Sequence, residues 1–201
     1  KLDPSPDQRW PTRLAIYKSG VKVDYTLAGE ERIQEMVDAK SLDTIYQRGY
    51  RVLIDRTGLA DHLPEPTGTV FPAPSPTQQE FQTAVEIFFF EASHIPKYLA
   101  RGDLWPAKLR DQTLKKYCLR MMAWHAATTR NAKTDIWHNG HHMQDWLDPD
   151  LYEKAFGIFG GFDAASSLTA LQNQIDLFRQ VANDVAIQAG LTYPQSVDDD
   201  I

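Results

Sequence analysis

Gly20-Val21-Lys22-Val23-Asp24-Tyr25-Thr26-Leu27 is the stretch that decides the fold, because it has the pattern of a β-strand with a carboxylate at its centre. Its side chains alternate between two faces: Val21, Val23, Tyr25 and Leu27 form an apolar face, and Lys22, Asp24 and Thr26 form a polar one. Aspartate is disfavoured inside strands, so Asp24 needs either solvent or a functional role. On this strand alone, a polar face wetted by solvent is the simpler interpretation.

The residues around this strand predict an α+β unit. Leu14-Ala15-Ile16-Tyr17 is expected to be a neighbouring strand, joined by Lys18-Ser19-Gly20 as a hairpin with glycine at the turn. Helices are expected over residues 29–40 and 42–49. Tyr50-Arg51-Val52-Leu53-Ile54-Asp55 is predicted to be a third strand. Residues 1–62 are therefore expected to hold part of a mixed sheet with its helices.

A proline-rich stretch follows this unit. We assign residues 63–76 to a stiff, extended linker on the strength of five prolines, which are Pro64, Pro66, Pro72, Pro74 and Pro76. The composition changes on either side of the stretch, which makes it the clearest predicted domain boundary.

Beyond the linker, the pattern becomes helical over residues 77–201. Thr77-Gln78-Gln79-Glu80 is a capping box that starts a helix, and Pro96 is expected to kink or end it. A long helix is expected over 103–129, another begins at Asp148-Pro149, and the last covers about 165–189. The apolar stripe of the last helix consists of Leu168, Leu171, Ile175, Phe178, Val181 and Val185. Long helices with short connections indicate an α-helical bundle domain.

Composition narrows the class of protein. The chain has 201 residues and a formal net charge of -6, which argues against a nucleic-acid partner and is compatible with a cationic small molecule. Its single cysteine, Cys118, excludes a disulfide framework and favours a reducing cytoplasm. A buried structural thiol is the preferred interpretation of Cys118 over a nucleophile. We find neither a signal peptide nor an apolar run long enough to span a bilayer.

Several pieces of the chain match one known family in order and spacing. They are Arg13–Tyr17 with Gly20–Leu27, Val52–Gly58, Pro76-Thr77 with Glu80-Phe81, Lys97-Tyr98-Leu99 with Arg101–Leu104 and Ala107-Lys108, Met121–Trp124, Leu147–Glu153, and Tyr193-Pro194. From about Trp10 to Pro194, the chain thereby resembles the streptomycin (aminoglycoside 6-) adenylyltransferases. The resemblance implies a partial nucleotidyltransferase-type mixed sheet followed by a helical substrate-binding domain, with the ligand cleft between them.

Part of the family pattern is missing. Family members carry a Gly-Ser loop and an Asp-x-Asp pair on the first catalytic strand, and neither occurs ahead of Arg13. Asp3 and Asp7 lie in a proline-rich lead and do not match that pair. We interpret the chain as the C-terminal part of a longer protein, which by itself is expected to be inactive.

The resemblance implies transfer of AMP from MgATP to a hydroxyl of streptomycin or a similar aminoglycoside. Asp24 would bind Mg²⁺. The same carboxylate could also activate the drug hydroxyl. Two metal ions commonly align such a transfer by neutralising the triphosphate. The alternative is a non-catalytic ligand-binding or interaction module that retains the fold.

Five residues of the helical part are further candidates. Lys97 either meets the triphosphate of ATP or is a solvated helix lysine. Glu86 and Glu91 flank an aromatic run. Either one of them faces the cleft and binds cationic groups of the drug or acts as base toward its hydroxyl, or both are simply exposed to solvent, which is the favoured interpretation. Arg101 and Asp103 either bind substrate or form an ion pair at the start of a helix.

Three histidines, His138, His141 and His142, stand where some family members have lysines. Their spacing suits one helix face, but Gly140 interrupts the helix and no acidic or cysteine ligand completes a zinc set. Histidines at the surface or in a substrate cleft are therefore favoured over a zinc site.

Overall fold

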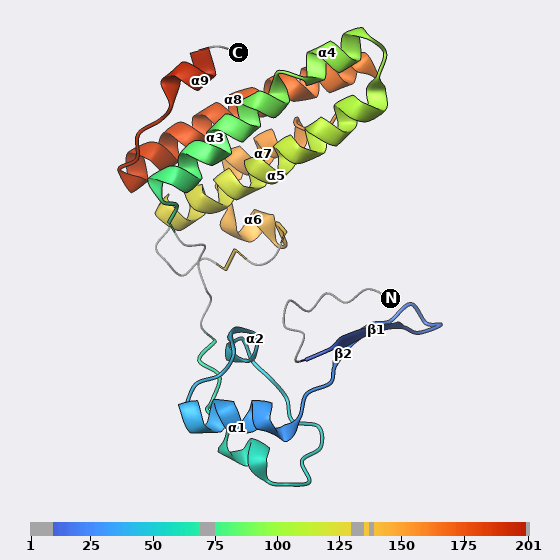
Figure 1. Ribbon diagram of the computed structural model, residues 1–201, viewed down its shortest axis with the longest axis vertical. Coiled ribbons are helices and arrows are strands. Elements are labelled where there is room, and N and C mark those ends of the chain that lie inside the picture. The colour runs from blue at the N-terminus through green and yellow to red at the C-terminus, as the bar shows by residue number, and fades with distance from the viewer. Residues whose placement is uncertain (1–9, 69–74, 130–134, 137–138, 200–201) are drawn as a thin grey trace. The chain divides into compact units, whose positions relative to one another are not determined.

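We describe residues 10–68, 75–129, 135–136 and 139–199 from a computed structural model (Figure 1). The chain divides into two compact units, Lys1–Thr69 and Val70–Ile201. The first contains a small sheet and the second is helical, which confirms the α+β class. The predicted linker 63–76 includes residues 69–74, which lie outside the described residues, so its limits stay a prediction.

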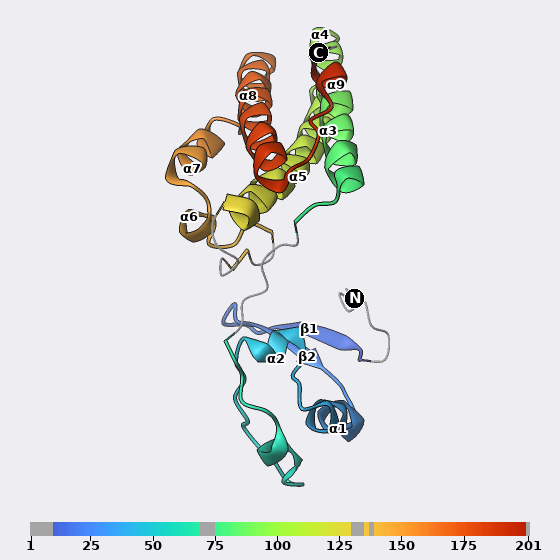
Figure 2. The same cartoon turned by 90° about the vertical axis from the view of Figure 1, so that its left-hand side faces the viewer.

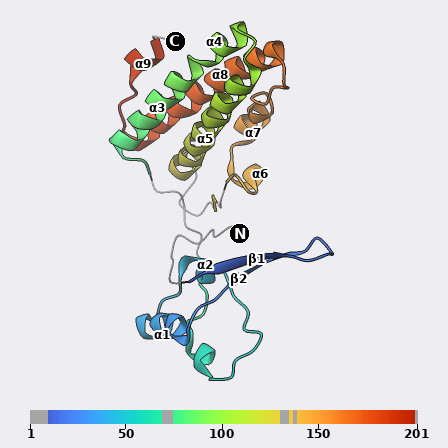
Figure 3. The same cartoon turned by 45° about the vertical axis from the view of Figure 1, so that its right-hand side comes forward.

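The sheet of the first unit is the predicted hairpin. Strands β1 (Thr12–Ile16) and β2 (Lys22–Thr26) pair antiparallel, with Leu14 opposite Asp24. Gly20 occupies the turn with φ +81°, a left-handed conformation that glycine adopts without steric cost. Figure 3 shows the hairpin extending as an arm from the helices of its unit. None of the residues of β1 and β2 is buried, and those of β2 are exposed except for the partly buried Val23.

Helix α1 (Glu30–Ala39) of the first unit is the helix expected over residues 29–40, and α2 (Thr44–Gln47) is a single turn within 42–49. A 3-10 helix, η1 (Leu59–His62), was not predicted and packs on α1. Asp55 shapes the approach to η1, because its carboxylate accepts hydrogen bonds from the backbone of Thr57, Gly58 and Ala60. These bonds lower the pKa of Asp55, with the Thr57 amide as the largest cause.

The prediction of a third strand at residues 50–55 is wrong. The described part of the sheet contains only β1 and β2, both antiparallel, so the expected mixed sheet is not formed there. Residues 50–55 have no strand neighbour, and Leu53 is 81% exposed. An apolar, β-branched sequence forms a strand only where another strand accepts its backbone hydrogen bonds.

The second unit opens with two helices that meet at the predicted proline break. Helix α3 (Gln78–Ala92) starts at Thr77, where the capping box is formed in full. Helix α4 (Ile95–Ala100) follows, with Pro96 in its first turn, where a missing backbone N–H costs nothing. The chain then reverses through Gly102 into α5 (Leu104–Thr129), the long helix expected over 103–129.

The remaining helices complete the bundle. They are α6 (Met143–Trp146), α7 (Pro149–Phe156), α8 (Ala164–Ala189) and α9 (Gln195–Asp199). Asp148 caps α7 and Gly190 ends α8, as predicted, whereas α9 was not foreseen. Helix α8 packs on α5 and on α3, and α9 lies against α3 (Figure 2). Among the described residues, no helix is both long and apolar enough to cross a membrane.

The core of the second unit is aromatic where α3 meets α8. Phe88 stacks on Phe178 with ring centroids 3.6 Å apart, and Phe89 meets Phe178 edge-on. Cys118 is buried on α5, and burial raises the pKa of its thiol to about 12. A thiol with so high a pKa is not a nucleophile at neutral pH, which agrees with the structural role expected for Cys118.

Candidate functional site

Asp24 lies at the centre of β2, on the polar face that the alternation predicts. Its carboxylate Oδ2 accepts a hydrogen bond from Lys22 Nζ at 3.1 Å, and its side chain is 50% exposed. On the same face, the hydroxyls of Thr12 and Thr26 bond across the strands at 2.9 Å. Asp24 is thus a reachable carboxylate on regular backbone, held by one lysine.

This setting fits one ligand position of Mg²⁺. The ion is commonly held by one or two carboxylates, with water and substrate phosphates as the other ligands. Within the described residues, no group of three or more histidine, cysteine, aspartate or glutamate side chains is placed to hold a metal. Among the described residues, Asp24 is therefore a lone reachable carboxylate and not part of a complete metal cage.

Glu91 and Glu86 lie in different surroundings on α3. The Glu91 side chain is only 12% exposed, and Arg110 Nη1 from α5 donates to its two oxygens at 2.9 and 3.0 Å. Its carboxylate is thereby neutralised inside the bundle. Glu86 is half-buried, and Gln82 donates to it at 2.8 Å.

The geometry of α3 separates these two glutamates further. Five residues correspond to about 140° around a helix, so Glu86 and Glu91 face different neighbours. Seven residues are about two turns, which puts Glu86 on the same side of α3 as Ser93. Ser93 lines a groove on the surface of the second unit, but Glu86 is not among the residues that line it. Glu91 faces α5 through Arg110.

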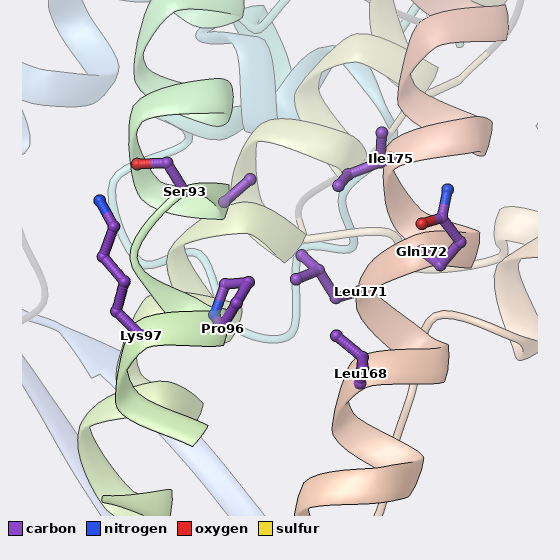
Figure 4. Close-up of a pocket in the computed structure, with 8 residues that line it drawn as sticks. Ser93, Pro96, Lys97, Leu168, Leu171, Gln172 and Ile175 are labelled. Atoms are coloured by element: carbon purple, nitrogen blue, oxygen red, sulfur yellow. The ribbon is translucent and has the colours of Figure 1, made fainter. Parts of the chain in front are cut away.

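The groove runs between the α3–α4 junction and the first half of α8, and encloses about 400 Å³. Figure 4 shows Pro96, Leu168, Leu171 and Ile175 pointing into the space between α4 and α8. Lys97 and Ser93 lie along one rim and Gln172 lies on the other side. The predicted phosphate ligand Lys97 is therefore a rim residue of a mainly apolar groove.

Arg101 and Asp103 are both exposed at the turn between α4 and α5. These two described residues form no ion pair with each other. The geometry therefore does not support an Arg101–Asp103 ion pair at the start of a helix. Arg101 follows Lys97 by four residues and ends α4, which places two exposed cations one helical turn apart.

The histidine segment is described in part. His138 lies outside the described residues. His141 and His142 are exposed, with ring centroids 6.2 Å apart, and His142 Nδ1 lies 3.9 Å from Asp145. Their outward position is that of surface histidines.

Several residues of these sites were missed by sequence reasoning. Arg110 gave no local signal, because it meets Glu91 only when α3 and α5 pack. Ser93 and Gln172 are ordinary polar helix residues until the groove forms. Leu168 was expected in the core as part of the α8 stripe, yet it is 52% exposed at the groove.

Comparison with known proteins shows which family the chain resembles over its whole length. The model of the family described as Streptomycin adenylyltransferase matches residues 1–201. The chain is 23% identical over 182 residues to an "Aminoglycoside 6-adenylyltransferase" of Campylobacter jejuni, covering 90% of this chain and 61% of the relative. It is 22% identical over 185 residues to a protein of that name from Bacillus subtilis (strain 168), covering 92% of this chain and 62% of the relative. The chain thus spans about three-fifths of each relative's length.

A solved structure shares the fold. The crystal structure of an aminoglycoside 6-adenyltransferase from Bacillus subtilis superposes with a TM-score of 0.58 at 20% sequence identity. The match covers 96% of this chain and 68% of the other. Because the family match extends over the whole chain, this protein belongs to the streptomycin adenylyltransferase family.

Proposed function

We propose that the whole protein is an aminoglycoside O-adenylyltransferase, which transfers AMP from MgATP to a hydroxyl of streptomycin or a similar drug. The match of the family model to residues 1–201 is the observation that carries this proposal. In this reaction, the drug hydroxyl attacks the α-phosphorus of ATP, an oxygen–phosphorus bond forms, and the bond to the leaving pyrophosphate breaks. We assign the reaction to the reducing cytoplasm, consistent with a single, buried cysteine.

Asp24 is proposed to hold the metal. Its half-exposed carboxylate on a regular strand is positioned by the backbone and needs only to release Lys22 to accept a cation. Mg²⁺, when bound, would neutralise the charge of the triphosphate.

The helical unit is proposed to bind the two substrates. Lys97 and Arg101 are exposed cations one turn apart, which suits contact with phosphate. Glu86 is proposed to bind guanidinium or ammonium groups of the drug or to accept the hydroxyl proton. We prefer it to Glu91 because Arg110 already occupies the Glu91 carboxylate. Asp103, exposed beside Arg101, is proposed as a second contact for cationic groups.

The test is an adenylyl-transfer assay on the protein expressed from its complete reading frame. We expect pyrophosphate release that requires both ATP and streptomycin, with a drug product heavier by one adenylyl group. Lys116→Gln changes an exposed lysine of α5 and serves as the control for Lys97→Gln, which we expect to raise the KM for ATP. Absence of transfer to any aminoglycoside would instead support a non-catalytic binding module.

A further inference from the structure

The groove between α4 and α8 combines an apolar lining with a positive rim. Leu171 and Ile175 of α8 form its floor, and Pro96 of α4 faces them. Ala92 of α3 also lines the groove. Leu168 extends the apolar lining and remains half open to solvent at 52% exposure. The volume of about 400 Å³ falls within the range of small-molecule sites in proteins, about 300–1,000 Å³.

One positively charged side chain, that of Lys97, lies at the rim of the groove. Lys97 is exposed and takes part in none of the ion pairs among the described residues. Arg101, one turn later, is also exposed but does not line the groove. The uncharged polar groups of the lining belong to Ser93 and Gln172, and no carboxylate lines the groove. The chain as a whole has a net charge of -6, whereas the lining of this groove has one lysine and no acidic residue.

We infer that this groove binds an organic anion with an apolar body, the body resting on Leu171 and Ile175 and the anionic group meeting Lys97. Apolar surface at the floor supplies affinity, and the ammonium at the rim fixes the orientation. This chemistry is available from two sources, the base and phosphate of a nucleotide or a non-nucleotide acid. The nucleotide alternative rests on the proposed function, which assigns Lys97 to the phosphates of ATP, whereas the non-nucleotide alternative is independent of it.

The probe is 8-anilinonaphthalene-1-sulfonate, an aromatic sulfonate whose fluorescence rises on binding apolar surface. We expect Lys97→Gln to raise its dissociation constant about three- to tenfold, the loss of one charged contact at an exposed rim. Leu168→Gln, which removes apolar lining, is expected to weaken binding about two- to fivefold. Both residues are exposed, so neither change is expected to disturb folding.

Matched controls separate the groove from other apolar surface. Lys116→Gln alters an exposed lysine of α5, and Ile187→Gln alters a side chain of α8 that is 75% exposed and does not line the groove. Neither is expected to change the dissociation constant. Equal weakening in the controls, or no change in Lys97→Gln and Leu168→Gln, would overturn the inference.

Competition then identifies the source of the anion. ATP without divalent metal and decanoate are each added to the probe complex. Displacement by ATP with dependence on Lys97 assigns the groove to the nucleotide, and displacement by decanoate alone assigns it to a non-nucleotide acid. Either result supports an organic-anion site, whereas displacement by neither competitor counts against it.

Discussion

Exchanging the two glutamates of α3 for glutamine separates a stabilising carboxylate from a ligand-binding one. Glu91 is 12% exposed, with both oxygens bound by Arg110, so Glu91→Gln leaves the guanidinium facing a neutral amide. A hydrogen bond to a charged group contributes about 1.5–3 kcal/mol, and partial exposure of the pair reduces the expected loss to about 1–2 kcal/mol of unfolding free energy. Glu86→Gln preserves the contact with Gln82 and is expected to change that free energy by less than about 0.5 kcal/mol.

Tryptophan fluorescence during urea unfolding measures the stability of both variants. Four of the five tryptophans, at positions 105, 124, 137 and 146, belong to the helical unit, so the signal reports mainly on that unit. Calorimetric titration with streptomycin measures affinity, which we expect to fall about tenfold in Glu86→Gln and to persist in Glu91→Gln. The reverse pattern, with stability lost in Glu86→Gln and affinity lost in Glu91→Gln, would refute this assignment of the two carboxylates.

Three further results are expected. Asp24→Asn, made in the protein expressed from its complete reading frame, keeps the shape of the side chain and removes its charge. Turnover is expected to fall about 100-fold, with little change in drug affinity. Turnover within a few-fold of the parent protein would show that Asp24 is not part of the site. Cys118 is the only cysteine and is buried, so native protein should not react with a thiol reagent, while protein unfolded in urea should react with one equivalent; rapid reaction of the native protein would contradict this. Hydrogen bonds from the backbone N–H and the hydroxyl of Thr77 hold the pKa of Glu80 below its ordinary value of 4.5. The stability that this cap contributes is therefore fully present above pH 4.5 and is lost as the pH falls through the lower folded-state pKa; an NMR titration giving 4.5 or higher for Glu80 would count against the cap.

Local signals predicted most of the helical unit. Thr77 and Glu80 fix a helix start by contacts three residues apart, and Gly190 ends a helix because its left-handed conformation is cheap only for glycine. The third strand failed for the opposite reason. Whether residues 50–55 pair depends on a strand distant in sequence, and their apolar pattern does not identify that partner.

The sequence predicted which types of residue would be candidates for the site, but not which side chains they would contact. Alternation placed Asp24 on the polar face of a strand, and the structure keeps it there. For Glu86 and Glu91, however, the sequence left both possibilities open, because the deciding residue, Arg110, comes from another helix. The groove beside Lys97 was not predictable, since it arises from the break between α3 and α4 and from an α8 stripe that is only partly covered.

The exposed hairpin has a consequence for the behaviour of the protein in concentrated solution. In the described part of a two-stranded sheet, each strand keeps one outer edge whose backbone groups lack a strand partner, and such edges template pairing between molecules. Tyr25 and Leu27 add apolar side chains to β2 and its end, at 45% and 62% exposure, whereas Lys22 and Asp24 place charges on the other face of the strand. Self-association is accordingly expected to begin at this arm rather than at the helical bundle, and added charge along β2 would raise the concentration at which the chain stays dispersed.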